Sequence, residues 1–210
     1  MGRIWFRQLA QIAGLIALAG TDVEGKAGRR PVDVVLYVEG FAPGPIDLGA
    51  RQIVNGMYGR LGITLAWHDA PKSDVKPAGA VSIQIRFVSG NPKAASQNAL
   101  AYALPYADGI NAITVMYERI RRIADGKTIF ERSLLAHVLA HEIGHVLEGT
   151  TLHSESGVMK AQWTGWDYGA MVGGPLDFTR EDAAMILRGL AAWKLSAAPA
   201  KLANKSGSAR

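Results

Sequence analysis

The chain has 210 residues, 49% of them hydrophobic and none of them cysteine, so it can form one domain with a full core but no disulfide, thiolate metal site or cysteine nucleophile. Its formal net charge of +5 comes from two basic residues before position 20 and three after position 196. The remaining 18 basic and 18 acidic side chains cancel, so the body of the chain has no charge excess that would attract nucleic acid.

Residues 1–20 have the pattern of a secretory signal peptide. Arg3 and Arg7 precede an apolar run of about a dozen residues, and Ala17-Leu18-Ala19 fits a small-x-small cleavage site. We therefore expect a secreted or periplasmic protein whose mature chain starts near Gly20 or Thr21. The alternative is a buried or amphipathic N-terminal helix. The run is too short to span a bilayer comfortably, and we expect no other segment to cross one.

The next part of the chain predicts an α/β unit. Residues 32–39 are β-branched and apolar, as in a buried strand, and residues 63–68 and 80–88 also have strand patterns. Residues 46–61 carry apolar side chains at helical spacing. This order of elements predicts a sheet with the first helix crossing over it.

Two more strands are expected at residues 98–106 and 112–118, on either side of an Asp108-Gly109 turn. Pro105 has no N–H to donate to a neighbouring strand, which confines its own strand to a sheet edge or to a strand end. The predicted sheet therefore has about five strands.

A helix with an apolar stripe follows. Thr128 and Glu131 have the spacing of a capping box ahead of it, and Gly149 predicts a left-handed stop. The stripe has helical spacing and consists of Leu134, Leu135, Val138, Leu139, Ile143, Val146 and Leu147.

Inside this helix His141, Glu142 and His145 spell H-E-x-x-H. Residues four apart lie on one helix face, so both imidazoles can bind one ion while Glu142 lies beside it. Hydrolytic zinc sites use these groups, two as ligands and one as the base for a metal-activated water. Catalytic zinc usually takes a third protein ligand, and His153 follows Gly149 where a reversing chain would return it to the ion.

Residues 134–159 resemble the metzincin zinc peptidases, whose pattern is H-E-x-x-H-x-x-G-x-x-H followed by a methionine turn. His141, Glu142 and His145 match this pattern directly. The resemblance implies the same zinc chemistry for them.

The spacing after the second histidine departs from that pattern. Gly149 stands one position late and His153 two positions late, so Thr151, a poor zinc ligand, holds the strict place of the third histidine. We expect His153 to be the ligand, because a loop can absorb two residues at little entropic cost. Met159 takes the place of the methionine in the turn, and the alternative is an ordinary core methionine.

The resemblance covers roughly residues 32–194 and implies an α/β (α+β) fold: a twisted mixed sheet with a crossover helix, an active-site helix and a C-terminal helix. It implies that residues 99–105 form an edge strand along the cleft, able to pair with an extended substrate; a plain edge strand is the alternative. Thr179 is expected to cap the last helix, whose buried face would comprise Ala183, Ile186, Leu187, Leu190 and Trp193. We expect one domain at residues 21–196 and a disordered tail at residues 197–210.

Several carboxylates are alternative third ligands. Glu148 follows the apolar face of the helix, while Asp167, Asp177 and Glu181 lie downstream and would each make a different type of zinc site.

Other residues have two interpretations each. His137, one turn before His141, either hydrogen-bonds a ligand or is a satisfied helix histidine, and His68 at a strand end is not expected to bind metal. Residues 160–175 look irregular, and their Trp163 and Trp166 either wall a specificity pocket or pack in the core.

The sequence thus predicts a monomeric zinc endopeptidase that acts on proteins or peptides, with Zn²⁺ held by His141, His145 and His153 and Glu142 as general base. One alternative is a metzincin-like domain that binds zinc or peptide without cleaving it, as the altered spacing suggests. The other is a structural protein in which the motif is accidental.

Overall fold

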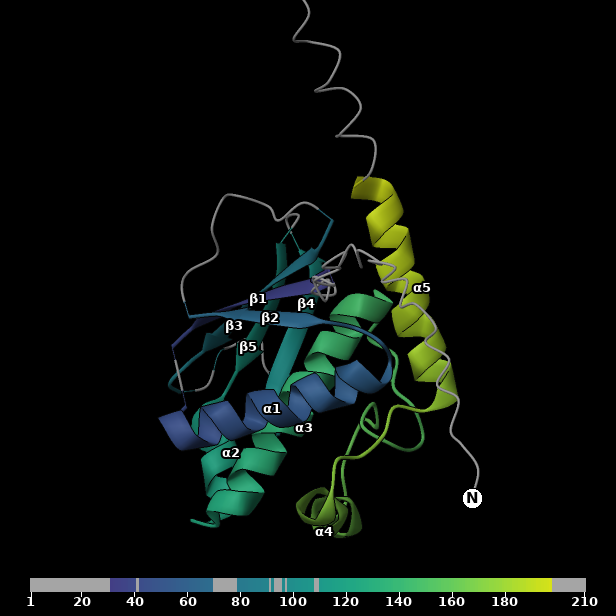
Figure 1. Ribbon diagram of the computed structural model, residues 1–210. Coiled ribbons are helices and arrows are strands. Elements are labelled where there is room, and N and C mark those ends of the chain that lie inside the picture. Colours follow the sequence, from purple (N-terminus) through teal and green to yellow (C-terminus); the bar gives the residue numbers. More distant parts are fainter. Residues whose placement is uncertain are drawn as a thin grey trace, which may run out of the picture.

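The computed structural model describes residues 31–40, 42–69, 79–90, 92, 96, 98–107 and 110–197. The expected signal peptide and residues 198–210 of the expected tail lie outside this part of the chain. In order, the elements are β1 (Val34–Glu39), α1 (Gly44–Arg60), β2 (Leu65–His68), β3 (Val81–Phe87), β4 (Ala101–Ala107), β5 (Ile110–Val115), α2 (Tyr117–Ala124), α3 (Thr128–Glu148), α4 (Gly165–Gly173) and α5 (Arg180–Ala197) (Figure 1).

The five strands form one mixed sheet in the order β2-β1-β3-β5-β4. All neighbours are parallel except β4, which pairs antiparallel with β5 at the edge. The parallel pairing of β1 with β2 requires a crossover, and α1 provides it. The expected α+β fold with a mixed five-stranded sheet is confirmed, as is the edge position of the strand that contains Pro105.

Helix α3 lies at the centre of the molecule, between the sheet and the other helices (Figure 1). It packs on α1, α2, α4 and α5 as well as on β4 and β5, so every residue from Ser133 to Leu147 is buried. The hydroxyl of Tyr58 in α1 donates to the carbonyl of Ala140 at 2.8 Å, which joins the two central helices. The helix that carries the H-E-x-x-H motif is thus held from several sides.

Three local expectations are wrong. Thr128 and Glu131 form no capping box: Lys127 is the N-cap residue without a side-chain hydrogen bond, and Glu131 accepts a hydrogen bond from the Tyr117 hydroxyl instead. Residues 117 and 118, expected to end a strand, begin helix α2, and residues 165–173, expected to be irregular, are helix α4.

The C-terminus of α3 and the N-terminus of α5 agree with the expectations from the sequence. Gly149 ends α3 with φ 68°, as expected. Thr179 caps α5, because its Oγ1 accepts from the backbone N–H of Asp182 at 3.1 Å. Leu187, however, is 45% exposed rather than part of the buried face. Within the described part of the chain, no helix has the length and apolar character that crossing a membrane requires.

Candidate metal centre

His141, Glu142 and His145 are all buried residues of helix α3. Each side chain is less than a tenth exposed. The histidines are one helical turn apart, with ring centroids separated by 4.5 Å. Their Nε2 atoms lie 2.9 Å apart, so the two imidazoles point to one place.

The chain after Gly149 reverses and returns His153 to the same place. Its Nε2 atom lies 3.3 Å from that of His145, and one nitrogen from each of the three rings lies within 4.8 Å of the others. The reversal is closed by a hydrogen bond from the Ser154 N–H to the Met159 carbonyl at 2.9 Å. The two additional residues of this loop therefore do not prevent the third histidine from joining the first two.

Hydrogen bonds orient the two helix histidines. Nδ1 of His141 lies 2.8 Å from the Val158 carbonyl oxygen, and Nδ1 of His145 lies 3.0 Å from that of Thr150. A carbonyl oxygen only accepts, so each Nδ1 carries a proton and each neutral ring presents a lone pair at Nε2. Burial lowers the pKa of both rings to about 4, which keeps them neutral at physiological pH.

This donor set fits a zinc ion. Zn–N bonds are about 2.0–2.1 Å long, so tetrahedral geometry separates two nitrogen ligands by about 3.3 Å. The Nε2 separations of 2.9 and 3.3 Å are close to that value. Two lone pairs this close repel each other unless a cation lies between them. The three histidines can therefore hold a metal ion, and their roles as ligands stay predictions.

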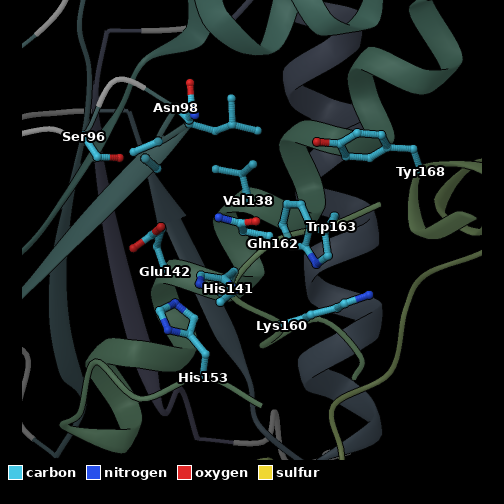
Figure 2. Close-up of a pocket in the computed structure, with 14 residues that line it drawn as sticks. Ser96, Asn98, Val138, His141, Glu142, His153, Lys160, Gln162, Trp163 and Tyr168 are labelled. Carbon is cyan, nitrogen blue, oxygen red and sulfur yellow. The ribbon is translucent and has the colours of Figure 1, made fainter. Parts of the chain in front are cut away.

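Glu142 lies next to this group and faces the same opening. Its carboxylate, His141 and His153 lie together at one end of a pocket in Figure 2. Burial raises the pKa of Glu142 to about 8, although a backbone hydrogen bond from Ala103 in the edge strand β4 acts in the opposite direction. A carboxyl group with this pKa can exchange a proton near neutral pH.

The pocket has a volume of about 470 Å³ and extends from the histidines along α3. Its walls are the segment leading into β4, Val138 of α3, and the chain from Lys160 to Tyr168. The ring of Trp163 lies 5.7 Å from that of His141, and Tyr168 lies at the far end (Figure 2). Trp163 therefore walls the pocket and also packs against the hydrophobic core, whereas Trp166 is 91% exposed.

Met159 is fully buried beneath the histidine helix, where its sulfur contacts Gly144. It follows His153 in the chain and packs on α3 between the positions of the two helix histidines, and its assignment to a methionine turn stays a prediction. The residue is both a core methionine and a neighbour of the candidate metal centre.

The alternative third ligands are engaged elsewhere or lie outside the histidine group. Asp167 accepts hydrogen bonds from Lys160 and Thr164, which lower its pKa to about 2, and Asp177 pairs with Arg60. Glu148 and Glu181 do not belong to the group either, and Thr151 is exposed.

The other histidines have structural roles. His137 has both ring nitrogens bonded, because Nδ1 donates to the Ser133 carbonyl and Nε2 accepts from the Leu176 N–H. It is a satisfied helix histidine. His68 stacks on Tyr37 at the sheet.

Sequence reasoning missed several neighbours of the site. The carbonyls of Val158 and Thr150 orient the histidines, but a backbone acceptor leaves no signal in the sequence. The buried Asp182, which bonds Ser154 beside His153, looks like an ordinary N-terminal helix acid when read from the sequence. A scan against protein-family models finds no match to this chain, and a search of curated proteins finds none either.

Proposed function

We propose that this protein is a zinc-dependent peptidase of the metzincin type. One observation carries the proposal: three histidine nitrogens converge beside a buried carboxylate at the mouth of a pocket. Three histidine ligands with a fourth position left open are a donor set of catalytic zinc sites, which is why we propose zinc rather than a harder cation.

His141, His145 and His153 would hold Zn²⁺, which when bound supplies Lewis acidity that activates water and polarises a carbonyl group. Glu142 then accepts a proton from the attacking water on its carboxylate. It passes this proton to the nitrogen of the leaving amine, so the peptide bond breaks without releasing an amide anion. Burial raises the pKa of Glu142 in the metal-free site, so this carboxyl group holds a proton more readily than an exposed glutamate does.

The substrate would lie between β4 and the chain after Met159. β4 is the edge of the sheet and runs beside α3, with Ala103 hydrogen-bonded to Glu142. An extended peptide can add to such an edge through its backbone. One of its side chains would then enter the pocket toward Trp163 and Tyr168. An unfolded or extended protein segment is therefore the proposed substrate, in an extracytoplasmic compartment if residues 1–20 act as a signal peptide.

The test is Glu142→Gln, measured by zinc content and by hydrolysis of a fluorogenic peptide library. Loss of a general base costs about 10²–10⁴-fold in rate, so we expect hydrolysis to fall by that factor while zinc stays bound. Glu155→Gln, at an exposed loop position near the site, is the matched control and should keep full activity. Full hydrolysis by a zinc-loaded Glu142→Gln protein would refute the proposed base.

A second candidate function is zinc or peptide binding without cleavage. The observation in its favour is that His153 is exposed on a loop two residues longer than the metzincin pattern, unlike the two buried helix histidines. Stoichiometric zinc with no turnover of any library peptide would support this function, and any cleavage that depends on Glu142 would exclude it. A purely structural role for the motif predicts instead that no divalent metal is bound.

A further inference from the structure

The loop that carries His153 is fastened to the N-terminus of α5 by a buried carboxylate. Asp182 is 1% exposed. Its Oδ1 accepts a hydrogen bond from the Ser154 hydroxyl, and its Oδ2 accepts one from the Thr179 N–H at 3.0 Å. Because the Asp182 N–H also donates to Thr179 Oγ1, the carboxylate belongs to a reciprocal helix cap and has little freedom to move.

Ser154 is the residue next to His153, and it is held at two points. Its N–H donates to the Met159 carbonyl, and its hydroxyl donates to Asp182. The backbone of His153 is therefore anchored immediately after its α-carbon. A side chain on a loop is placed only as well as the backbone that carries it.

His153 needs such an anchor more than the other two histidines do. His141 and His145 sit on a buried helix, and each has a carbonyl oxygen against Nδ1. His153 is exposed, and among the described residues no group hydrogen-bonds its Nδ1. Orientation of its ring relative to the helix histidines thus depends on the loop backbone.

A second contact presses the same loop against the segment before α5. Val158 donates its N–H to the Asp177 carbonyl at 3.0 Å, and a Cβ added at Gly157 would lie 2.5 Å from that same oxygen. Gly157 has φ 75°, which also favours glycine. The loop from Ser154 to Met159 therefore contacts the segment 177–182 at Ser154, Gly157 and Val158.

We propose that Asp182 is a positioning residue for the third metal ligand, acting on His153 through Ser154. The N-terminus of α5 is then part of the support of the metal centre. The hydrogen bond between Asp182 and Ser154 explains how a loop longer than the metzincin pattern still brings its histidine to the ion. This inference rests on the metal-binding part of the proposed function and is independent of whether the protein cleaves peptides.

The experiment compares two single substitutions that separate the Asp182–Ser154 hydrogen bond from the helix cap. Ser154→Ala removes the hydrogen bond to the loop but leaves Asp182 capping α5. Thr179→Ala weakens the cap but leaves the Asp182–Ser154 bond in place. Zinc affinity is measured on the full chain by competition with a chromogenic chelator. The visible spectrum of the cobalt-loaded protein reports the ligand geometry, and thermal unfolding of the metal-free protein reports stability.

Neither Ser154 nor Asp182 bonds the His153 ring, but residues that orient a metal ligand typically contribute about 10–100-fold to metal affinity. We expect that loss for Ser154→Ala and Asp182→Ala, together with a changed cobalt spectrum, whereas Ser154→Thr keeps the hydroxyl and should retain wild-type affinity. Thr179→Ala should lower the unfolding temperature and leave zinc affinity within about threefold of the wild type.

Ser154→Ala with wild-type zinc affinity and an unchanged cobalt spectrum would overturn the proposal, even if Asp182→Ala fails to fold. A wild-type chain that binds no zinc would overturn both this proposal and the proposed function. A wild-type chain that binds zinc but cleaves nothing would remove the peptidase alone, and the affinity series would still decide the role of Asp182.

Discussion

The sulfur of Met159 lies against the backbone of Gly144, between the two helix histidines. A Cβ added at Gly144 would come within 2.6 Å of Sδ and 3.0 Å of Cε, closer than such atoms approach. Met159 is fully buried, and Phe178 Cε1 would lie 3.6 Å from the same Cβ, so an added methyl group would have to displace a buried side chain. Gly144 is needed for this close approach rather than for an unusual backbone conformation.

Gly144→Ala should therefore destabilise the protein. Overpacking a core costs about 1–3 kcal/mol, which exceeds the gain of up to about 1 kcal/mol from placing alanine in a helix. We expect a net loss in the free energy of unfolding, measured by urea denaturation, and weaker metal binding. Gly59→Ala in α1, where a Cβ meets nothing within 4 Å, is the control and should be neutral or stabilising. Equal stability of Gly144→Ala and the wild type would mean that the sulfur can move away.

His153→Ala should weaken zinc binding by more than about 100-fold, because loss of a ligand costs more than loss of a group that supports one. His68→Ala is the matched control, since His68 stacks on Tyr37 and does not belong to the metal group. Thr151→Ala tests the position that the strict metzincin register would assign to the ligand, and we expect no change. Competition with a chromogenic chelator measures all three affinities. Wild-type affinity of His153→Ala would exclude this histidine as a ligand.

Glu148 should make the protein less stable as the pH rises. Burial, and then the nearby Asp182 charge, raise the pKa of Glu148 to about 7 from an ordinary value of 4.5. Between these values the folded state binds more protons than the unfolded state, so the free energy of unfolding falls as the pH increases through this window. The stability gained when folded Glu148 holds its proton is fully present below pH 4.5 and lost above pH 7.

Glu148→Gln keeps a neutral side chain at every pH and should remove this dependence. After a discount for the partial exposure of the side chain, we expect the variant to be more stable than the wild type by about 1–2 kcal/mol at pH 8. The two should converge near pH 4.5. Urea denaturation of the metal-free proteins at several pH values measures the difference. A difference that does not vary with pH would show that Glu148 titrates at its ordinary value.

Tyr58→Phe should destabilise the contact between α1 and α3 by about 1 kcal/mol, because it removes one buried hydrogen bond and leaves the ring in place. The lost bond joins the Tyr58 hydroxyl to the Ala140 carbonyl at 2.8 Å. The ring itself still packs on Phe178, with centroids 5.2 Å apart. Tyr102→Phe, at a half-buried position of β4, is the control and should change stability by less than about 0.5 kcal/mol. A loss of stability equal to that of Tyr102→Phe would mean that the hydrogen bond from the Tyr58 hydroxyl contributes nothing.

Elements with a strong local pattern were predictable. The β-branched run that forms β1 and the alternating residues of β3 lie within one residue or two of the expected strands. The αL stop at Gly149 needs only the absence of a side chain, and the Thr179 cap needs only a hydroxyl three residues before its N–H partner. Both signals are local, which is why they are visible in the sequence.

The first element that the sequence analysis assigned wrongly depends on a distant contact. Helix α2 begins at Tyr117, whose hydroxyl donates to Glu131 of α3, so a residue with a strand pattern forms a helix that packs on another helix. The same contact takes Glu131 away from the expected capping box. Helix α4 is a different case: its capping box of Thr164 and Asp167 is local, but only Met171 of the helix is buried, so the segment has no apolar stripe that would indicate a helix.

For the candidate site, the sequence by itself determined that His141, Glu142 and His145 share one helix face, because helical periodicity places residues i and i+4 together whatever surrounds them. Only the tertiary structure decided that His153 joins them. Its position depends on the path of a loop and on the Asp182 carboxylate, which comes from a helix 28 residues further along the chain than Ser154. Spacing along a chain specifies geometry within a helix, but across a turn the geometry is set by whatever the turn packs against.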